Sequence, residues 1–224
     1  TVKGCYIEAE RDVAGIVGTT SNLRSFENNY VENTQIVYHS AKTYETASLI
    51  ASQRVAVDVP ASNKAIDTTI LLVALTSQNI KDALNNKEDV VLATDVSLVG
   101  STGGYNKAGL VLSGNTIDGK GNTLTVTNAN STWDCAVYHQ GGTIKNLVIE
   151  GAFRGIFTAG CSSDIIIDNV TIDNVCYTFS SDTGNANYSI IVTNSTLNGW
   201  TSYTGGYKSV TFEGCKFGKG TGAY

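Results

Sequence analysis

The stretch TIKNLVIE at residues 143–150 sets a pattern that returns three times further along the chain. The later copies are IIDNVTID at 166–173, IVTNSTLN at 191–198 and TFEGCKFG at 211–218. Each copy has an apolar residue, any residue, Asn or Gly, a small or apolar residue, any residue, and a second apolar residue. The Asn or Gly position recurs at intervals of 23, 25 and 20 residues (146 to 169, 169 to 194, 194 to 214).

A period of about 20–25 residues suits one coil of a solenoid. The apolar residues alternate with polar ones, so they share one face of a strand. Stacked coils would join this face into one apolar column and would let each strand bond to the strands of the coils on either side. The pattern therefore predicts one buried file, made of Ile144, Ile167, Val192 and Phe212.

The Asn or Gly position of the pattern predicts a sharp turn in each coil. Asn and Gly tolerate the left-handed backbone conformation that bends a chain sharply between two strands. If the coils stack, Asn146, Asn169 and Asn194 would form a ladder of side-chain amides. A leucine-rich horseshoe is the competing architecture, but it requires several leucines in each repeat, and Ile and Val dominate here.

Composition and charge exclude several classes. Residues 1–100 hold 4 of the 23 glycines, and the Gly-, Asn-, Thr- and Ser-rich remainder indicates short strands and frequent turns. The formal net charge of −5 argues against a nucleic-acid surface, and a hydrophobic fraction of 42% argues against disorder. The longest apolar run, residues 70–75, is too short to span a membrane. Methionine is absent even at position 1, which predicts a processed chain.

One helix is expected, at residues 77–86, with Thr76 or Ser77 as its N-cap and apolar residues on one face. A strand is predicted directly after it, at residues 89–98. Because the ends of a solenoid expose unpaired strand edges, the helix is expected to cover the first coil of the repeat region. The carboxy-terminal end has no matching cap, so further coils or another chain are expected there.

The first thirty residues carry the same pattern, as VKGCYI at 2–7 and FENNYV at 26–31, spaced by 24 residues (2 to 26). Residues 56–69 have no clear period and contain the only proline, Pro60. Two parts are therefore predicted: a short solenoid-like segment at 1–60 and the main repeat region with its helix at 61–224.

The stretch from Gly142 to Gly151, with RGIF at 154–157 and DIIIDNVTI at 164–172, resembles right-handed parallel β-helix proteins of the pectate-lyase-like superfamily. The region from the helix onward is most similar to bacterial cell-surface and adhesin-like proteins. The segment VKGCYI with VAGIVG at 13–18 resembles the GLUG-type repeat of bacterial surface proteins. The resemblance implies an all-β fold, a right-handed parallel β-helix (β-solenoid) with a short helical cap.

The resemblance also implies two functions. The first is a non-catalytic extracytoplasmic protein, secreted or on the cell surface, that binds a polysaccharide or a host glycan. The second is a polysaccharide lyase or glycoside hydrolase with a divergent site. The Arg-x-Pro-x-x-Arg run of pectate lyases and the Asn-Thr-Asp, Asp-Asp, His-Gly and Arg-x-Lys motifs of polygalacturonase-like hydrolases are absent. The sequence therefore favours the non-catalytic function and assigns no catalytic residues.

Four charged residues are the only candidates for a divergent site. Asp164, Asp168 and Asp173 lie near two turns, where turn residues usually bond their own backbone; Ca²⁺ is the alternative, although a calcium site needs more oxygen ligands. Arg154, surrounded by small residues, is expected to present an accessible guanidinium for a sugar carboxylate, with a surface salt bridge as the alternative. No other cofactor and no metal site are predicted.

Aromatic residues outside the apolar pattern are the stronger candidates for ligand binding. Sugars stack their C–H faces on such rings, and packing on the outer face is the alternative. With Arg154, the predicted ligand-binding residues are Trp133, Tyr138, Tyr177, Trp200 and Tyr203.

The cysteines and one histidine complete the candidates. No CxxC pair occurs among the five cysteines, so a zinc site is not expected. Cys5 and Cys215, which follow the turn Gly, are expected to point inward, and a bond between Cys161 and Cys176 is less favoured than buried thiols. His139 lies near Asp134 and Cys135, but nearness in sequence is weak support for a nucleophile–base arrangement.

Overall fold

The computed structural model describes residues 1–9, 13–14, 28–40, 47–48, 62–74, 76–99, 109–127 and 135–220. The chain divides into two compact units, Thr1–Leu75 and Thr76–Tyr224. The predicted boundary between residues 60 and 61 lies outside the described residues. Across the described part, strands predominate, and every strand pair is parallel.

The first unit contains three small parallel sheets, whose strands follow one another at similar intervals along the chain. The first sheet is β1 (Val2–Lys3), β4 (Tyr30–Glu32) and β7 (Lys64–Ile66). The second is β2 (Tyr6–Ala9), β5 (Gln35–Ser40) and β8 (Thr69–Ala74), and the third is β3 (Val13–Ala14) with β6 (Ala47–Ser48).

The register of the first unit corrects the predicted amino-terminal repeat. Val2 pairs with Val31, a spacing of 29 residues (2 to 31), so the predicted pairing of residues 2–7 with 26–31 is wrong by five. Gly4, Asn33 and Asp67 all have positive φ, at 60°, 47° and 45°, and they mark the true turn position. The sequence misled because Asn28 also follows an apolar and a polar residue, and its own φ is 56°.

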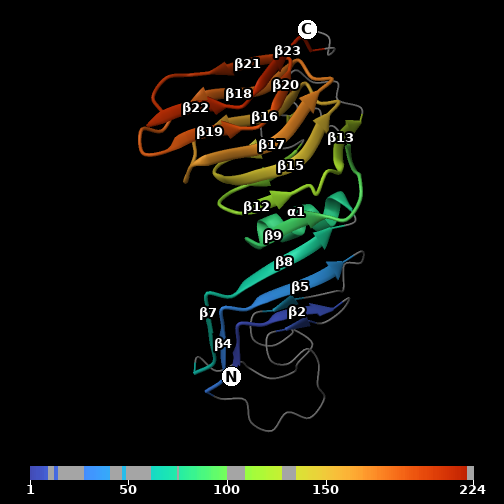
Figure 1. The fold of residues 1–224 in the computed structure, drawn as a ribbon, viewed down its shortest axis with the longest axis vertical. Coiled ribbons are helices and arrows are strands. Elements are labelled where there is room, and N and C mark those ends of the chain that lie inside the picture. Colours follow the sequence, from blue (N-terminus) through green and yellow to red (C-terminus); the bar gives the residue numbers. More distant parts are fainter. Residues whose placement is uncertain are drawn as a thin grey trace. The chain divides into compact units, whose positions relative to one another are not determined.

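The second unit contains three longer parallel arrays of strands (Figure 1). The first runs β9 (Asp89–Leu92), β12 (Thr116–Asp118), β15 (Gly142–Glu150), β17 (Ile165–Asp173), β19 (Ser189–Thr193), β22 (Ser209–Glu213). The second array runs β10 (Val96–Val99), β13 (Thr123–Thr127), the carboxy-terminal halves of β15 and β17, β20 (Thr196–Asn198), β23 (Lys216–Gly218). The third runs β11 (Leu110–Leu112), β14 (Cys135–His139), β16 (Arg154–Ala159), β18 (Tyr177–Thr183), β21 (Trp200–Tyr203).

The predicted apolar file is confirmed. Ile144 pairs with Ile167, Ile167 with Val192, and Val192 with Phe212. The first three are at most 1% exposed, and Phe212, on the last described strand of the array, is half-buried. Two further files run beside it, one through Leu124, Ile149, Ile172, Leu197 and Phe217 and one through Leu110, Val137, Ile156 and Phe179.

The predicted turn position is confirmed as well. Asn146, Asn169 and Asn194 have φ values of 52°, 53° and 52°, and Gly214 has a φ of 63°. Asn194 and Gly214 bend the chain between two strands of neighbouring arrays. Asn146 and Asn169 bend β15 and β17 internally, so that the two halves of each strand join different arrays. This left-handed bend accounts for Asn or Gly at this position in these coils.

The helix α1 (Ser77–Asn85) forms where the sequence predicted it, one residue shorter. The Thr76 hydroxyl accepts a hydrogen bond from the Asn79 backbone N–H at 3.2 Å, which caps the amino-terminal end. Its buried face contains Ile80, Ala83 and Leu84 and packs against β9, β10 and β11 (Figure 1). The helix thus covers strands of the first coil of this unit, as expected. It is far too short and polar to cross a membrane, and it is the one helix in the described part of the chain.

Two local expectations are wrong. The strand predicted at residues 89–98 is broken after Leu92, because the chain turns there to reach the neighbouring array, where it resumes as β10. Cys5 is exposed and Cys215 is only half-buried, although both follow a turn Gly. Both lie beside terminal strands of their arrays, whereas Ser195, at the matching position of an inner coil, is 1% exposed.

Candidate functional site

A polar surface forms where β12, β15 and β17 lie side by side. Strand pairing places Asp118 next to Lys145 and Lys145 next to Asp168, so charges of opposite sign alternate from coil to coil. The Lys145 ammonium lies 3.7 Å from the Asp118 carboxylate, and that of Lys120 lies 3.2 Å from it. Alternation of sign between neighbouring strands is stabilising because like charges directly opposite one another would repel.

The predicted ladder of asparagine amides forms between Asn146 and Asn169, but Asn194 does not continue it. The Asn169 side-chain N–H₂ donates to Asn146 Oδ1 at 2.8 Å, and Asn146 donates in turn to Asp118 Oδ1 at 3.0 Å. Asn194 instead donates to Asp168 Oδ1 at 2.9 Å. A carboxylate is a stronger acceptor than a neutral amide, which accounts for the departure from an all-asparagine ladder.

These bonds hold two carboxylates in the charged form. Burial raises the pKa of Asp118, but the hydrogen bonds from Asn146 and Lys120 and the Lys120 charge outweigh it, so the pKa lies below its ordinary value. The pKa of Asp168 is also lowered, first by the Thr193 hydroxyl, which donates at 2.6 Å, and then by Asn194.

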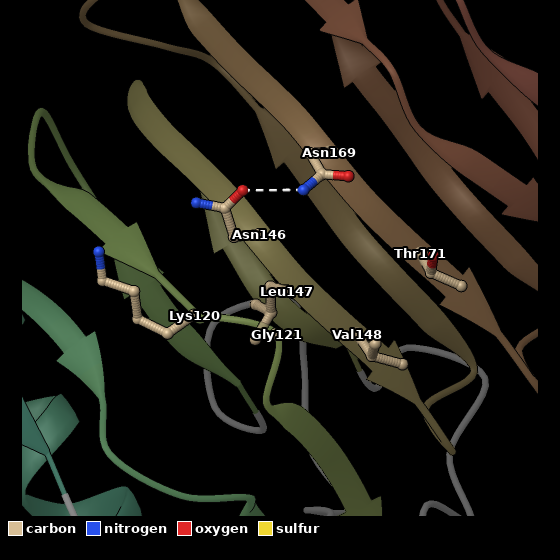
Figure 2. Close-up of a pocket in the computed structure, with 7 residues that line it drawn as sticks. All are labelled: Lys120, Gly121, Asn146, Leu147, Val148, Asn169 and Thr171. Atoms are coloured by element: carbon tan, nitrogen blue, oxygen red, sulfur yellow. Dashed lines mark hydrogen bonds between the residues drawn. The ribbon is translucent and has the colours of Figure 1, made fainter.

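A groove of about 490 Å³ lies along this ladder (Figure 2). The picture shows the Asn146 and Asn169 amides facing each other, with Lys120 on the neighbouring coil and Val148 and Thr171 further along the two strands. The full lining is Lys120, Gly121, Asn146, Leu147, Val148, Asn169 and Thr171. The amide, hydroxyl and ammonium groups of this lining, beside Leu147 and Val148, offer hydrogen bonds to a hydroxylated ligand. Residue spacing alone did not indicate the groove, because Lys120 enters it from another coil.

Substitutions at Asn169 can separate the two contributions of the turn residue, which are its left-handed backbone conformation and its side-chain hydrogen bond. We expect Asn169→Ala to lower the free energy of unfolding by about 1–2 kcal/mol, because alanine at a φ of 53° is strained and the amide bond is lost. Asn169→Gly is the matched control, and it loses the bond without the strain. Chemical denaturation measures both. Equal losses would show that the left-handed conformation is not what selects asparagine here.

A row of aromatic rings forms a second surface. The ring centroids of Phe153 and Tyr177 are 5.7 Å apart, and those of Tyr177 and Trp200 are 6.0 Å apart, in edge-on geometry. Strand pairing places Trp200 beside Tyr177. Two backbone bonds at Trp200 fix its position: its N–H donates to Cys176 at 2.9 Å and its carbonyl accepts from the Thr178 hydroxyl at 3.1 Å.

Trp200 is the last ring of this row and is exposed to solvent. Its exposed fraction is 61%, and it borders a cavity of about 410 Å³. The rest of the lining is Val175, Cys176, Gly199, Gly218, Lys219 and Gly220. A Cβ at any of the three glycines would meet the protein's own atoms, so these glycines allow the neighbouring coils to pack closely beside the cavity. Lys219 supplies a cation at the same cavity. Sequence analysis selected Trp200 but missed Gly199 beside it and Gly218, Lys219 and Gly220, which reach the cavity from the following coil.

Arg154 does not present the accessible guanidinium that its small neighbours suggested. The residue is 8% exposed, and its guanidinium carbon lies 4.8 Å from the Phe157 ring centroid and 5.7 Å from that of Tyr177. Phe157, itself fully buried, and Tyr177 cover the group that glycine and alanine neighbours would have left open. The arginine therefore stabilises the base of the aromatic row.

The other predicted aromatics have different environments. Tyr138 stacks on Phe157 at 5.6 Å between centroids, and its hydroxyl donates to the Ala159 carbonyl at 3.0 Å, which is an outer-face packing role. Tyr203 is 48% exposed and lies 6.1 Å from the Phe212 ring. Trp133 lies outside the described residues.

The three aspartates do not share a site. Asp164 accepts from the Ser189 backbone N–H at 2.7 Å, and Asp173 from the Asn198 amide at 3.1 Å and the Asn174 backbone N–H at 2.6 Å. The carboxylates of Asp164 and Asp168 bond to the next coil and not to their own turn as expected. Asp173 bonds both to the next coil and, as expected, to its own turn. Among the residues that the structure describes, no three His, Cys, Asp or Glu side chains are gathered as a metal site requires.

His139 is fully buried, and its Nδ1 accepts from the Gly141 backbone N–H at 3.2 Å. Burial lowers its pKa to about 4. Asp134 lies outside the described residues. All five cysteines are free thiols, and burial raises the pKa of Cys161 and Cys176, which makes these thiols less reactive.

Comparisons of this chain with protein-family models, with curated proteins and with solved structures find no match. The geometry of the two surfaces is therefore the basis of the functional argument.

Proposed function

We propose that this chain is a parallel β-helix protein of the extracytoplasmic, secreted or cell-surface type, and that it binds a polysaccharide or host glycan without catalysis. Recurring parallel strands, continuous buried files and the helix on the first coil of the second unit support the β-helix. Membership of the pectate-lyase-like superfamily and the amino-terminal GLUG-type repeat are part of the same proposal and rest on the sequence resemblance.

The observation that carries the proposal is Trp200. Large apolar side chains are usually withdrawn from water, and this one is 61% exposed while its backbone is held on both sides. An indole that contacts Tyr177 and lines the cavity provides a flat surface for the C–H face of a sugar ring. Lys219 at the same cavity offers hydrogen bonds to sugar hydroxyls.

The contacts of the four charged candidates, Arg154 and the three aspartates, favour binding over catalysis, because their charged groups are already engaged within the protein. The guanidinium of Arg154 contacts the rings of Phe157 and Tyr177, and Asp164, Asp168 and Asp173 are each bonded to the next coil. A polysaccharide lyase or glycoside hydrolase remains the second candidate from the resemblance. Incubation with polyuronides, followed by ultraviolet absorbance of the unsaturated product, tests it directly.

The Trp200→Ala variant tests the proposed function. We expect the chain to bind one or more members of a neutral and acidic glycan array, and this variant to weaken that binding at least about tenfold, or about 1.4 kcal/mol. Trp200→Phe keeps an aromatic face and should retain most of the affinity. Val99→Ala, at another residue that is 70% exposed, is the matched control. Isothermal titration calorimetry with the strongest array ligand measures all three.

Two results would contradict the proposal. One is an array without any glycan bound by the wild-type chain. The other is a Trp200→Ala variant whose affinity equals that of the Val99→Ala control.

A further inference from the structure

We propose that the groove along the asparagine ladder binds a sugar unit that carries a carboxylate, with the Lys120 ammonium as the group that receives this carboxylate. The inference rests on the proposed function for the class of ligand, a glycan, and adds a second site and a charge requirement. The groove shares no lining residue with the cavity at Trp200. It lies at β12, β15 and β17, each of which is paired with a strand on both sides.

One wall of the groove exists because its turn is longer than the turn of the following coil. From Ile117 to Leu124 the chain advances 7 positions (117 to 124). The residues that pair with these two, Ile144 and Ile149, are only 5 positions apart (144 to 149). The turn at residues 118–122 therefore contains two more residues than the turn beside it, and the shorter turn leaves space along the longer one.

The longer turn is held firmly against the next coil. The Gly119 N–H donates to the Lys145 carbonyl at 2.9 Å, and the Gly121 N–H donates to the Asn146 carbonyl at 2.7 Å. A Cβ at Gly119 would lie 2.5 Å from the Asn146 carbonyl oxygen, so this close approach requires glycine. Lys120, which is exposed between the two glycines, is therefore presented from a preorganised backbone.

The cations beside the groove face solvent, whereas the carboxylates are engaged within the protein. The side chains of Lys120 and Lys145 are 59% and 41% exposed, and both ammonium groups share the Asp118 carboxylate, whose side chain is 9% exposed. Asp168 accepts two side-chain hydrogen bonds from the following coil and does not line the groove. Among the described residues of the lining, Lys120 alone is charged. An anionic ligand group is therefore favoured there.

The uncharged part of the lining suits the hydroxyl groups of a sugar. Figure 2 shows the Asn169 side-chain oxygen on the side away from Asn146. Within the described chain, neither this oxygen nor the Thr171 hydroxyl has a hydrogen-bond partner. A sugar hydroxyl can donate to the amide oxygen, and it can donate to or accept from the threonine. The groove volume of about 490 Å³ is in the range of roughly 300–1,000 Å³ that is usual for ligand pockets.

Calorimetric titration of the Trp200→Ala variant isolates the groove from the other site. The probes are a trimer of galacturonic acid, as in a polysaccharide, and sialyllactose, as in a host glycan. Each is compared with its methyl ester, which keeps the shape and removes the charge. We expect at least one acid to bind at least about tenfold more tightly than its ester, and the acid that binds more tightly identifies the source of the carboxylate.

Three substitutions in the same background assign this binding to residues. Lys120→Gln should weaken binding of the acid at least about tenfold, because the cation is lost. Thr171→Val keeps the charge and removes a hydroxyl, so it should weaken binding about threefold to tenfold. Lys208→Gln, at another exposed lysine of the second unit, is the matched control and should leave the affinity unchanged. Circular dichroism verifies that each variant is folded.

Three results overturn the groove and leave the proposed function standing. The first is that the acids bind the wild-type chain but not Trp200→Ala. The second is equal affinity for acid and ester, and the third is equal affinity of Lys120→Gln and Lys208→Gln for the acid. Failure of the proposed function is recognised separately, because the wild-type chain then binds no glycan of the array or Trp200→Ala has no effect on array binding.

Discussion

Replacing Ile167 by alanine is expected to lower the free energy of unfolding of the second unit by about 3 kcal/mol. The side chain is 1% exposed and lies between Ile144 and Val192, both at 0%, in the confirmed file. Close packing on both sides keeps the neighbours from closing the cavity, so the lost burial and the cavity both contribute. Urea denaturation followed by circular dichroism measures the change.

Two companion variants make this result interpretable. Ile167→Val removes one methylene and should cost about 1 kcal/mol. Val99→Ala alters an exposed side chain and should stay within about 0.5 kcal/mol of wild type. An Ile167→Ala loss as small as that of Val99→Ala would show that the file does not stabilise the stacked coils.

The second large effect is a loss of stability in acid that depends on His139. Burial lowers the pKa of this imidazole from 6.5 to about 4, although a backbone hydrogen bond at Ile166 acts in the opposite direction. Below pH 6.5 the unfolded chain takes up a proton that the folded chain does not accept until about pH 4. The stability present above pH 6.5 is therefore lost progressively down to pH 4, by about 3 kcal/mol.

His139→Leu isolates this effect. Leu112, which pairs with His139 on the preceding strand, is fully buried, so leucine suits the position. The variant should lose about 1 kcal/mol at pH 7, where the bond from the Gly141 N–H is missing, and should be nearly insensitive to pH between 6.5 and 5. Below about pH 5, both chains should lose stability as Asp118 and Asp168, whose pKa values are lowered in the folded chain, take up protons. Denaturation midpoints between pH 6.5 and 5 measure both chains. Parallel pH profiles would refute the role of His139.

Much of the strand register could be predicted from the spacing of similar residues. The intervals between Asn146, Asn169, Asn194 and Gly214 equal the observed pairing intervals, because each coil must bring one inward apolar residue above the last. The same reasoning failed between residues 2–7 and 26–31. There several asparagines lie close together, and only the pairing of strands distinguishes the turn residue from its neighbours.

The surfaces were harder to predict than the files. Trp200 was selected from its polar surroundings, but its cavity depends on Gly218, Lys219 and Gly220, which lie in the next coil. Arg154 was misjudged for the same reason, since the rings that cover it come from its own strand and from the following one. Neighbours along the chain say little about neighbours across coils.

In the second unit, the sequence by itself determined the period, the turn residues, the helix and the buried file, because each follows from local backbone preference and the alternation of apolar side chains. Tertiary structure alone decided which polar groups meet. Whether Asn194 bonds to Asn169 or to Asp168, and whether Trp200 is left open while Arg154 is covered, depends on side chains about 20–30 residues away. Hydrogen bonds and ring contacts act over a few ångströms in space, and the stacking of coils sets those distances.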